Sequence, residues 1–396
     1  MDEKKTVVVG VTGGIAVYKA LDVISRFKKA GLDVYVIMTE HATKFVNPLS
    51  FQSLSQNMVV VDMFDEPKAW EIQHISLAKK ADLMLIVPAT VNIIGKVANG
   101  IADDMLSTTI MATKAPVVFA PAANTNMFLN PIVQRNIRVL KEYGYKFIEP
   151  VSGRLACGDV GTGKLQDTEL ISDIVISMMH DKKDLKGKKV LVTAGPTIAP
   201  IDPVRYITNR SSGKMGYAIA SEARDRGAEV TLVSGPCSIQ KPFGINVINV
   251  NTNAQMLKAV EDNFKSADII IKSAAVADYK PKVYSNKKIK KGEGQFSLEL
   301  ERDNDILKKL GSMKEKQILV GFAAESNDLI ENATTKLHKK NLDYIVANNI
   351  VSNDTGFASE DNKVTILCSD GRKIPLPKMN KKEVARELFD LINEKR

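Results

Sequence analysis

Continuous apolar runs alternate with amphipathic helical stretches along the first half of the chain. Val7–Val11 is one such run, as expected for a parallel strand that is covered on both faces. The stretch that follows has apolar side chains at helical spacing and ends at Gly31. Further apolar runs lie at residues 33–39, 82–90 and 115–124, with helical stretches between them. This βαβ succession predicts a doubly wound parallel sheet.

The second half repeats this plan. Its apolar runs lie at residues 188–197, 229–236, 267–278, 317–326 and 342–349. The fold class predicted is α/β, with two doubly wound parallel-sheet domains of the Rossmann or flavodoxin kind in tandem. The charged, non-periodic segment 181–189 is interpreted as a linker between a domain of residues 1–180 and one of residues 190–396.

The composition is that of a soluble globular protein, with 44% hydrophobic and 26% charged residues. The first residues lack the apolar core of a signal peptide, and no run reaches the roughly 20 apolar residues of a membrane span. We therefore expect a cytoplasmic protein with no membrane partner. The cysteines Cys157, Cys237 and Cys368 form no CxxC pair, which argues against a disulfide framework and a zinc site.

The net charge of +9 lies entirely in residues 181–396, because residues 1–180 carry 18 basic and 18 acidic side chains. A basic second domain suits a polyanion such as a nucleoside triphosphate. Nucleic acid is the weaker interpretation, and we expect no nucleic-acid partner. Scattered lysines on a solvated surface are the plain alternative.

A glycine turn connects the first apolar run to the first helical stretch. Thr12, Gly13 and Gly14 lie where free backbone N–H groups and the helix dipole favour a phosphate. The spacing is not GxGxxG, and Thr39 rather than an acidic residue ends the second run. The turn therefore disfavours an NAD-dependent dehydrogenase and leaves a monophosphate such as FMN. A glycine turn that merely joins a strand to a helix is the alternative.

Three polar residues of the first half are candidates for chemistry. His74 lies at the head of a helical stretch, and Cys157 lies in a glycine-dense loop. Asn124 ends an apolar run, where its amide could bind a carboxylate or an amide. Taken singly, a histidine or a cysteine is more often structural than catalytic.

Together these elements resemble the phosphopantothenoylcysteine decarboxylases, within the flavin-containing cysteine decarboxylase superfamily. The matching segments, in the family's order, are GVTGGIAVYK, HISLAKKADL, PATVNIIGKVANGIADDMLS, PAANTNM and ACGDVGTG. One departure is Ala123, which stands where the family usually has Met. Since Asn124 and Met127 are retained, we expect adjusted packing at the substrate rather than lost activity.

The resemblance implies that FMN oxidises the thiol of an N-acyl cysteine, which then loses CO₂, and that reduced flavin returns the electrons. His74 would be the acid or base or would orient the carboxylate, Cys157 would supply a proton, and Asn124 would hold the carboxylate. The residues implied to line FMN are Thr12, Gly13, Gly14, Thr39, Phe45, Pro88, Ala89, Thr90 and Val91. A regulatory flavoprotein is the alternative, disfavoured because both His74 and Cys157 are present.

The first turn of the second half has different chemistry. After TAGPT (193–197), residues 201–216 present Asn209, cations, hydroxyls and glycine ahead of a helical stretch. Such a loop suits phosphate binding, although GxxxxGK[ST] is absent. Lys336 and Lys340 are spaced to share one helix face, and with KKIKK (287–291) they could clamp a triphosphate. Asp278 could face Mg²⁺, a base or a ribose.

These segments resemble phosphopantothenate–cysteine ligase. The matching segments are TAGPT, DPVRYITNRSSGKMG, SAAVADY, KIKK, NDIL, GFAAES and the helix of Lys336 and Lys340. The resemblance implies that CTP, with Mg²⁺, activates 4′-phosphopantothenate as an acyl-cytidylate, and that the amine of L-cysteine then attacks it. Asn209 would assist conversion of the acyl intermediate, and Lys288 would contact phosphates. The other residues implied to bind substrates are Arg205, Asp278, Asn304, Asp305, Ile306, Leu307, Phe322, Lys336 and Lys340.

The two resemblances together predict a bifunctional enzyme of coenzyme A biosynthesis, whose decarboxylase consumes the product of its ligase. One departure is Asn304: residues 304–306 read NDI where the family usually has PDI. The resemblance further implies a homo-oligomer in which trimers of the first domain and dimers of the second build a dodecamer. Flavin sites in the superfamily lie between subunits, so some residues of the first site would act in trans.

Overall fold

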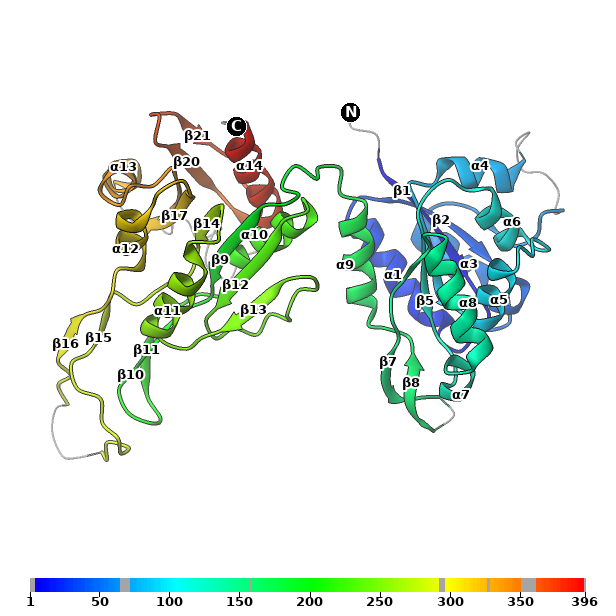
Figure 1. Ribbon diagram of the computed structural model, residues 1–396, viewed down its shortest axis with the longest axis horizontal. Helices are drawn as coiled ribbons and strands as arrows, with labels where there is room; N and C mark the ends of the chain where they lie inside the picture. Colours follow the sequence, from blue (N-terminus) through cyan, green and yellow to red (C-terminus); the bar gives the residue numbers. More distant parts are fainter. Residues whose placement is uncertain are drawn as a thin grey trace. The chain divides into compact units, whose positions relative to one another are not determined.

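The computed structural model describes residues 4–64, 72–156, 158–291, 296–325, 328–349 and 361–394. Contacts within the chain divide it into two units, residues 1–180 and 181–396 (Figure 1). Each unit has its own sheet and core, and each is described by itself. Within the described ranges, no helix has both the length and the apolar character needed to cross a membrane.

A six-stranded sheet, parallel throughout, forms the centre of the first unit, in the order β3-β2-β1-β4-β5-β6. Its strands are β1 (Thr6–Val11), β2 (Asp33–Met38), β3 (Val59–Val60), β4 (Leu83–Ala89), β5 (Val117–Pro121) and β6 (Lys146–Phe147). The strand order reverses between β1 and β4. In open α/β sheets, ligands bind at the carboxyl ends of the strands at such a switch point.

Helices cover both faces of this sheet, as the apolar runs predict. The helices are α1 (Val17–Lys29), α2 (Glu40–Thr43), α3 (Pro48–Ser55), α4 (Gln73–Lys80), α5 (Val91–Ala98), α6 (Met105–Ala112), α7 (Thr125–Phe128), α8 (Pro131–Glu142) and α9 (Thr168–Met178). Val7 and Val9 pack on the side of α1, whereas Val8 packs on the side of α5 and α6. A hairpin of β7 (Val151–Arg154) and β8 (Val160–Lys164) precedes α9.

An eight-stranded sheet of order β13-β12-β9-β14-β17-β18-β20-β21 forms the centre of the second unit. Its strands are β9 (Lys189–Ala194), β12 (Glu229–Ser234), β13 (Asn246–Asn249), β14 (Ile269–Lys272), β17 (Ile318–Glu325), β18 (Tyr344–Asn349), β20 (Val364–Cys368) and β21 (Lys373–Pro375). The first six are parallel, and the order reverses between β9 and β14. The predicted doubly wound sheet is thus confirmed, but its antiparallel edge of β20 and β21 is not predicted.

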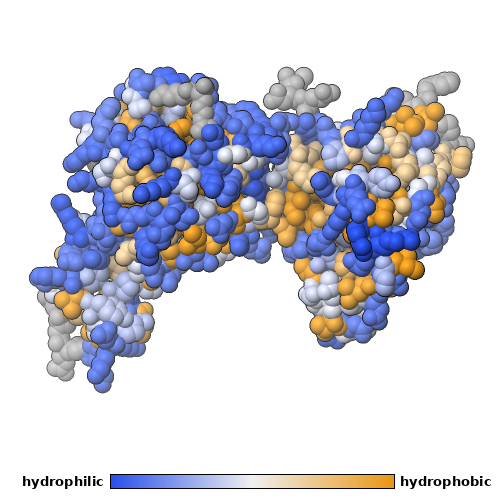
Figure 2. All heavy atoms as spheres, in the orientation of Figure 1, coloured by the Kyte–Doolittle hydropathy of each residue, from blue (hydrophilic) through white to orange (hydrophobic). Residues whose placement is uncertain are grey.

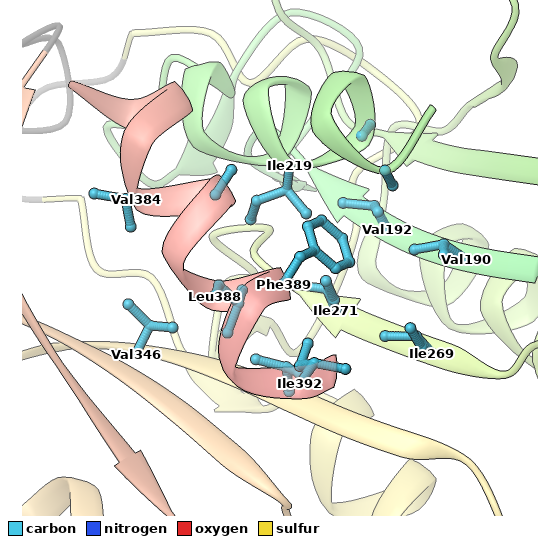
Figure 3. Close-up of a cluster of buried hydrophobic side chains, with 14 of the residues drawn as sticks. Val190, Val192, Ile219, Ile269, Ile271, Val346, Val384, Leu388, Phe389 and Ile392 are labelled. Carbon is cyan, nitrogen blue, oxygen red and sulfur yellow. The ribbon is translucent and has the colours of Figure 1, made fainter. Parts of the chain in front are cut away.

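The helices of the second unit are α10 (Lys214–Asp225), α11 (Asn253–Phe264), α12 (Ile306–Met313), α13 (Leu329–Lys339) and α14 (Lys381–Glu394). Figure 3 shows Leu388 and Phe389 of α14 among apolar side chains of the sheet and Ile219 of α10. Three ribbons complete the unit: β10 (Ile198–Pro200) with β11 (Tyr206–Thr208), β15 (Tyr279–Pro281) with β16 (Leu300–Arg302), and β19 (Asp361–Asn362) with β22 (Met379–Asn380).

One guanidinium is fully buried in the second unit. Arg226 forms ion pairs with Glu222 at 2.8 Å, with Asp390 at 2.7 Å and with Asp184 at 3.1 Å. Its backbone carbonyl accepts a hydrogen bond from the N–H of Leu185, whose side chain is buried in the core. Part of the segment interpreted as a linker therefore packs into the second unit and is fixed to both α10 and α14.

The two units differ in the character of their surfaces. Figure 2 shows hydrophilic residues over most of the visible face of the second unit. The first unit exposes larger apolar side chains, among them Ile15, Phe45, Leu49 and Phe64, each more than half exposed. Single exposed apolar residues need no explanation, whereas a contiguous apolar surface commonly contacts a partner protein.

Candidate functional sites

At the switch point of the first unit, the loops after β1 and β4 are joined by hydrogen bonds. The hydroxyl of Thr12 donates to the carbonyl of Pro88 at 2.7 Å and accepts from the N–H of Thr90 at 3.0 Å. Thr90 caps α5, and Thr39 caps α2 at the end of the neighbouring strand. Three threonines predicted from separate segments therefore lie around the carboxyl ends of β1, β2 and β4.

The same edge has the features that a flavin mononucleotide needs. Helix α1 begins without a side-chain cap, and the N–H groups of Val17 and Lys19 donate to the carbonyls of Gly14 and Ala16, so a phosphate would meet the turn before the helix and the positive end of its dipole. A Cβ on Gly13 would lie 2.5 Å from Cβ of His41, so only glycine allows the loop to pass there. Phe45 follows α2 shortly after its cap Thr39. Its ring is about half exposed and could pack against the apolar part of a flavin. The residues present therefore fit the group.

The segment of Asn124 is held against the loop that carries Cys157. The amide of Asn124 donates to a carboxylate oxygen of Asp159 at 3.1 Å, and its Oδ1 caps α7. The N–H of Ala123 donates to the carbonyl of Gly163, where an added Cβ would lie 2.4 Å from the Ala123 oxygen. Cys157 itself lies outside the described residues. Met127 is about half exposed on α7.

His74 lies on α4, away from the switch point. The neighbouring Ile72, Ile75 and Ser76 line a hollow together with Lys5 and Thr6 at the amino end of β1. Thr12 lies at the opposite end of that strand. The structure of a single chain therefore does not bring His74 together with the predicted flavin-binding residues.

A cavity of about 400 Å³ opens at the switch point of the second unit. It lies between the loop that joins β11 to α10, the end of β14 and the helices α10, α12 and α13. Nine of the residues predicted to act in this domain line it: Asn209, Asp278, Asn304, Asp305, Ile306, Leu307, Phe322, Lys336 and Lys340. Residues separated by more than one hundred positions in the sequence thus meet in one cavity.

The entrance to α10 contributes an anion-binding loop to this cavity. Gly213 has a φ of 79° and precedes the helix without a side-chain cap, so backbone N–H groups face the loop. Asn209 donates through Nδ2 to the carbonyls of Ala275 at 3.2 Å and Val276 at 3.0 Å. These bonds fix Asn209 beside the end of β14.

Charge in the cavity is strongly biased towards cations. Six cationic residues line it, against two carboxylates, those of Asp278 and Asp305. The cations are Arg210, Lys214, Lys272, Lys336, Lys340 and Lys381. Such an excess favours a polyanionic ligand.

The carboxylate of Asp305 holds part of this charge in place. Its Oδ2 lies 2.9 Å from Nζ of Lys340, and its Oδ1 accepts from the N–H of Lys308. Burial opposes ionisation, but these hydrogen bonds and the charge of Lys340 outweigh it and lower the pKa of Asp305. The predicted base-binding segment and the predicted phosphate clamp are therefore in direct contact.

Arg205 and Lys288 do not line the cavity. Arg205 pairs with Asp202 at 2.7 Å and also donates to the carbonyl of Ile289, next to Lys288 in the segment expected to form a flap. Burial raises the pKa of Asp202, but backbone N–H groups of Val204, Arg205 and Ile289 outweigh it, so the pKa lies well below its usual range. The buried carboxylate of Asp202 thus holds Arg205 and the backbone of Ile289, next to Lys288, outside the cavity.

Several cavity residues are missing from the sequence prediction, among them the polar residues Lys272, Asn348, Asn362 and Lys381. Lys272 ends a buried strand at the switch point, a position that could have marked it. Asn362 is buried, and its Oδ1 has no hydrogen-bond partner among the residues that the structure describes. Asn362 and Lys381 reach the cavity from β19 and α14. Nothing in the local sequence of these two elements indicates that they contact the cavity.

No cluster of three or more His, Cys, Asp or Glu side chains that could hold a metal ion occurs within the described ranges.

Comparison with known proteins gives the same division of the chain. A family model described as "Flavoprotein" matches residues 1–180, and one described as "DNA/pantothenate metabolism flavoprotein C-terminal domain" matches residues 185–395. The second model alone spans more than half of the chain.

Curated relatives match along their whole length. The "Coenzyme A biosynthesis bifunctional protein CoaBC" of Bacillus subtilis is 50% identical over 395 residues, which cover 99% of this chain and 97% of that protein. The protein of the same name from Borreliella burgdorferi is 44% identical, with 99% and 100% covered. That from Escherichia coli is 41% identical over 392 residues, with 98% and 96% covered. The chain therefore belongs to the family of bifunctional coenzyme A biosynthesis proteins, in which an N-terminal flavoprotein decarboxylase domain is joined to a C-terminal phosphopantothenate–cysteine ligase domain.

Proposed function

We propose that the ligase uses CTP and that the nucleotide binds in the cavity of the second unit. The single observation that carries this proposal is the meeting of Asn209, Asp278, Lys336 and Lys340 around one cavity rich in cations. Lysines there would neutralise the charge that develops as pyrophosphate leaves an acyl-cytidylate of 4′-phosphopantothenate. Mg²⁺ would enter together with the triphosphate.

In this proposal Asn209 orients the activated acyl group for attack by the amine of L-cysteine. Its amide is already fixed by two backbone carbonyls at the end of β14, so little motion is lost when the substrate binds. Arg205 and the backbone N–H of Ile289, next to Lys288, are both bound by the carboxylate of Asp202 outside the cavity. Lys288 would reach phosphates by movement of its segment over the bound nucleotide.

A stepwise assay tests the ligase proposal. With CTP, Mg²⁺ and 4′-phosphopantothenate, the protein should release one equivalent of pyrophosphate and stop, and added cysteine should restart turnover. Lys336→Gln should raise the CTP concentration needed for half-maximal pyrophosphate release. Lys339→Gln should leave that concentration unchanged, because Lys339 is exposed on the same helix and lies outside the cavity. Steady pyrophosphate release at the same rate with and without cysteine would contradict a stable acyl-cytidylate intermediate.

We further propose that the flavin of the first unit is FMN, bound at the switch point between β1 and β4. When bound, FMN would supply the reversible oxidation of the substrate thiol that makes loss of CO₂ feasible. Thr12 and Thr90 hold the two binding loops together, and the uncapped start of α1 would receive the phosphate. Purified protein should be yellow and release FMN on denaturation; a colourless protein that takes up no FMN would refute this.

We infer that His74 serves the flavin site of a neighbouring copy in a homo-oligomer, for which a dodecamer is the expected form. The position of α4 at the amino end of β1 and the exposed apolar side chains of the first unit support this. Asn124 would hold the substrate carboxylate, and Cys157 would return the final proton. Mixed oligomers of His74→Asn and Cys157→Ser chains should regain formation of the reduced, decarboxylated product, which neither variant completes alone, because intact pairs form across copies.

A further inference from the structure

Lys272 is a cation that the proposed ligase reaction leaves without a role. It is the last residue of β14, beside Thr193 of β9 and Gly321 of β17, and so lies at the centre of the switch point. Its ammonium donates one hydrogen bond, to the carbonyl of Ala274 at 2.9 Å. Its other two N–H groups have no partner among the described residues, although the side chain lines the cavity.

The charged groups around Lys272 come from three elements. Asp278 follows β14, Asp305 caps α12, and Lys336 and Lys340 belong to α13 and its end. Asp305 is already paired with Lys340 at 2.9 Å. No carboxylate of the described residues lies within ion-pair distance of Lys272, so its charge has no local counterion.

We propose that Lys272 is a proton-linked phosphate ligand of the ligase: its amine takes up a proton as the nucleotide enters, and its ammonium then binds the phosphates. The inference rests on the proposed binding of CTP in this cavity. The phosphate would supply the counterion that the protein lacks and would accept the two free N–H groups. No bond in the substrate changes in this step, and the proton comes from the solvent.

The acid–base properties of the cavity support this assignment. Burial, and after it the positive charge of Lys340, lowers the pKa of Lys272 to about 8. Near that pH the free protein includes a neutral form of this amine. A bound polyanion favours the charged form and raises the pKa again, so binding takes protons up. Uptake per nucleotide should therefore be larger at pH 8 than at pH 7.

Titration calorimetry of the full chain with CTP and Mg²⁺, in buffers of different ionisation enthalpy, measures this uptake directly. The absence of 4′-phosphopantothenate prevents turnover. At pH 8 the terminal phosphate, with a pKa of about 6, is fully ionised and contributes no proton of its own. Inorganic triphosphate and cytidine serve as separate probes for the phosphate and nucleoside parts.

Three variants give the matched comparison. Lys272→Met should abolish uptake and weaken binding about tenfold or more, as expected for loss of a charge-assisted hydrogen bond. Lys272→Arg should abolish uptake but keep most of the affinity, because arginine stays protonated. Lys339→Met should behave as the unaltered protein. Inorganic triphosphate should reproduce the uptake and cytidine should not.

Each contrary outcome has a separate meaning. Binding of CTP without proton uptake, or uptake that persists in Lys272→Met, would overturn the role of Lys272. Uptake caused by cytidine would overturn its assignment to the phosphates. If CTP does not bind at all, the proposed function fails, and inorganic triphosphate still tests Lys272 on its own.

Discussion

Replacement of Arg226 by methionine should destabilise the second unit while leaving the first unit unchanged. Arg226 is fully buried and is shared by Glu222, Asp184 and Asp390. Methionine fills part of the volume, but the carboxylates stay. Glu222 is nearly buried and would lose its 2.8 Å ion pair with the guanidinium, which is unfavourable for a carboxylate shielded from water, whereas Asp390 keeps Lys182 at 2.6 Å.

The expected magnitude follows from the exposure of the three carboxylates. Removal of one partner of a buried pair costs about 3–5 kcal/mol. The side chains of Asp390 and Asp184 are 27% and 35% exposed, so water can partly solvate them, whereas that of Glu222 is only 9% exposed. We therefore expect the lower end, about 3 kcal/mol. Arg372→Met is the control: its partner Asp370 is at the surface, and such pairs contribute about 0–1 kcal/mol.

Hydrogen exchange of the full chain in increasing urea, followed by mass spectrometry, resolves the two units. Peptides from α10 and α14 report the second unit, and peptides from α1 provide an internal control. In the Arg226→Met protein the free energy of opening of α10 and α14 should fall while that of α1 stays constant. A loss below about 1 kcal/mol, or one equal to that of Arg372→Met, would refute the reasoning.

Three further predictions concern the two sites. Gly163→Ala should reduce CO₂ release more than about tenfold, because the added Cβ meets the Ala123 carbonyl beside Asn124 at a φ of 137°, whereas Gly144→Ala, which also has a positive φ of 90° but meets no atom within 4 Å, should stay within about threefold. Thr12→Val should weaken flavin binding about fivefold, measured by flavin fluorescence on dilution; unchanged affinity would contradict the role of its hydrogen bonds. The depressed pKa of Asp305 contributes stability that is present above about pH 4 and is lost as pH falls through the folded-state value. Asp305→Asn should therefore flatten the acid dependence of the urea midpoint of the second unit and release Lys340; an unchanged slope would contradict this.

The positions of the central strands are predictable because a strand buried on both faces must be apolar throughout. Val7–Val11 and Ile269–Ile271 are such runs, and both lie beside a switch point. The antiparallel edge is different, because β20 and β21 are short and their pairing depends on contacts with β18. Nothing in the local sequence specifies that partner.

The ligase cavity could be predicted in part for a related reason. Residues that follow parallel strands or begin helices must gather at one edge of the sheet, so Asn209 and Asp278 meet although they lie far apart in sequence. Lys272 was missed because a lysine at a strand end also has an ordinary surface interpretation. Arg205 lies outside the cavity because the buried carboxylate of Asp202 binds its guanidinium, a contact that loop composition cannot reveal.

The packing of Leu185 decides where the two activities can be separated by cutting the chain. A fragment that begins at residue 190 would lose a buried leucine, worth about 1.5–3 kcal/mol, and the carboxylate of Asp184 that balances Arg226. A cut before Asp184 keeps both. An autonomous ligase, whether prepared in the laboratory or produced by gene fission, therefore has to carry the charged segment with it, although that segment contains none of the residues that line the cavity.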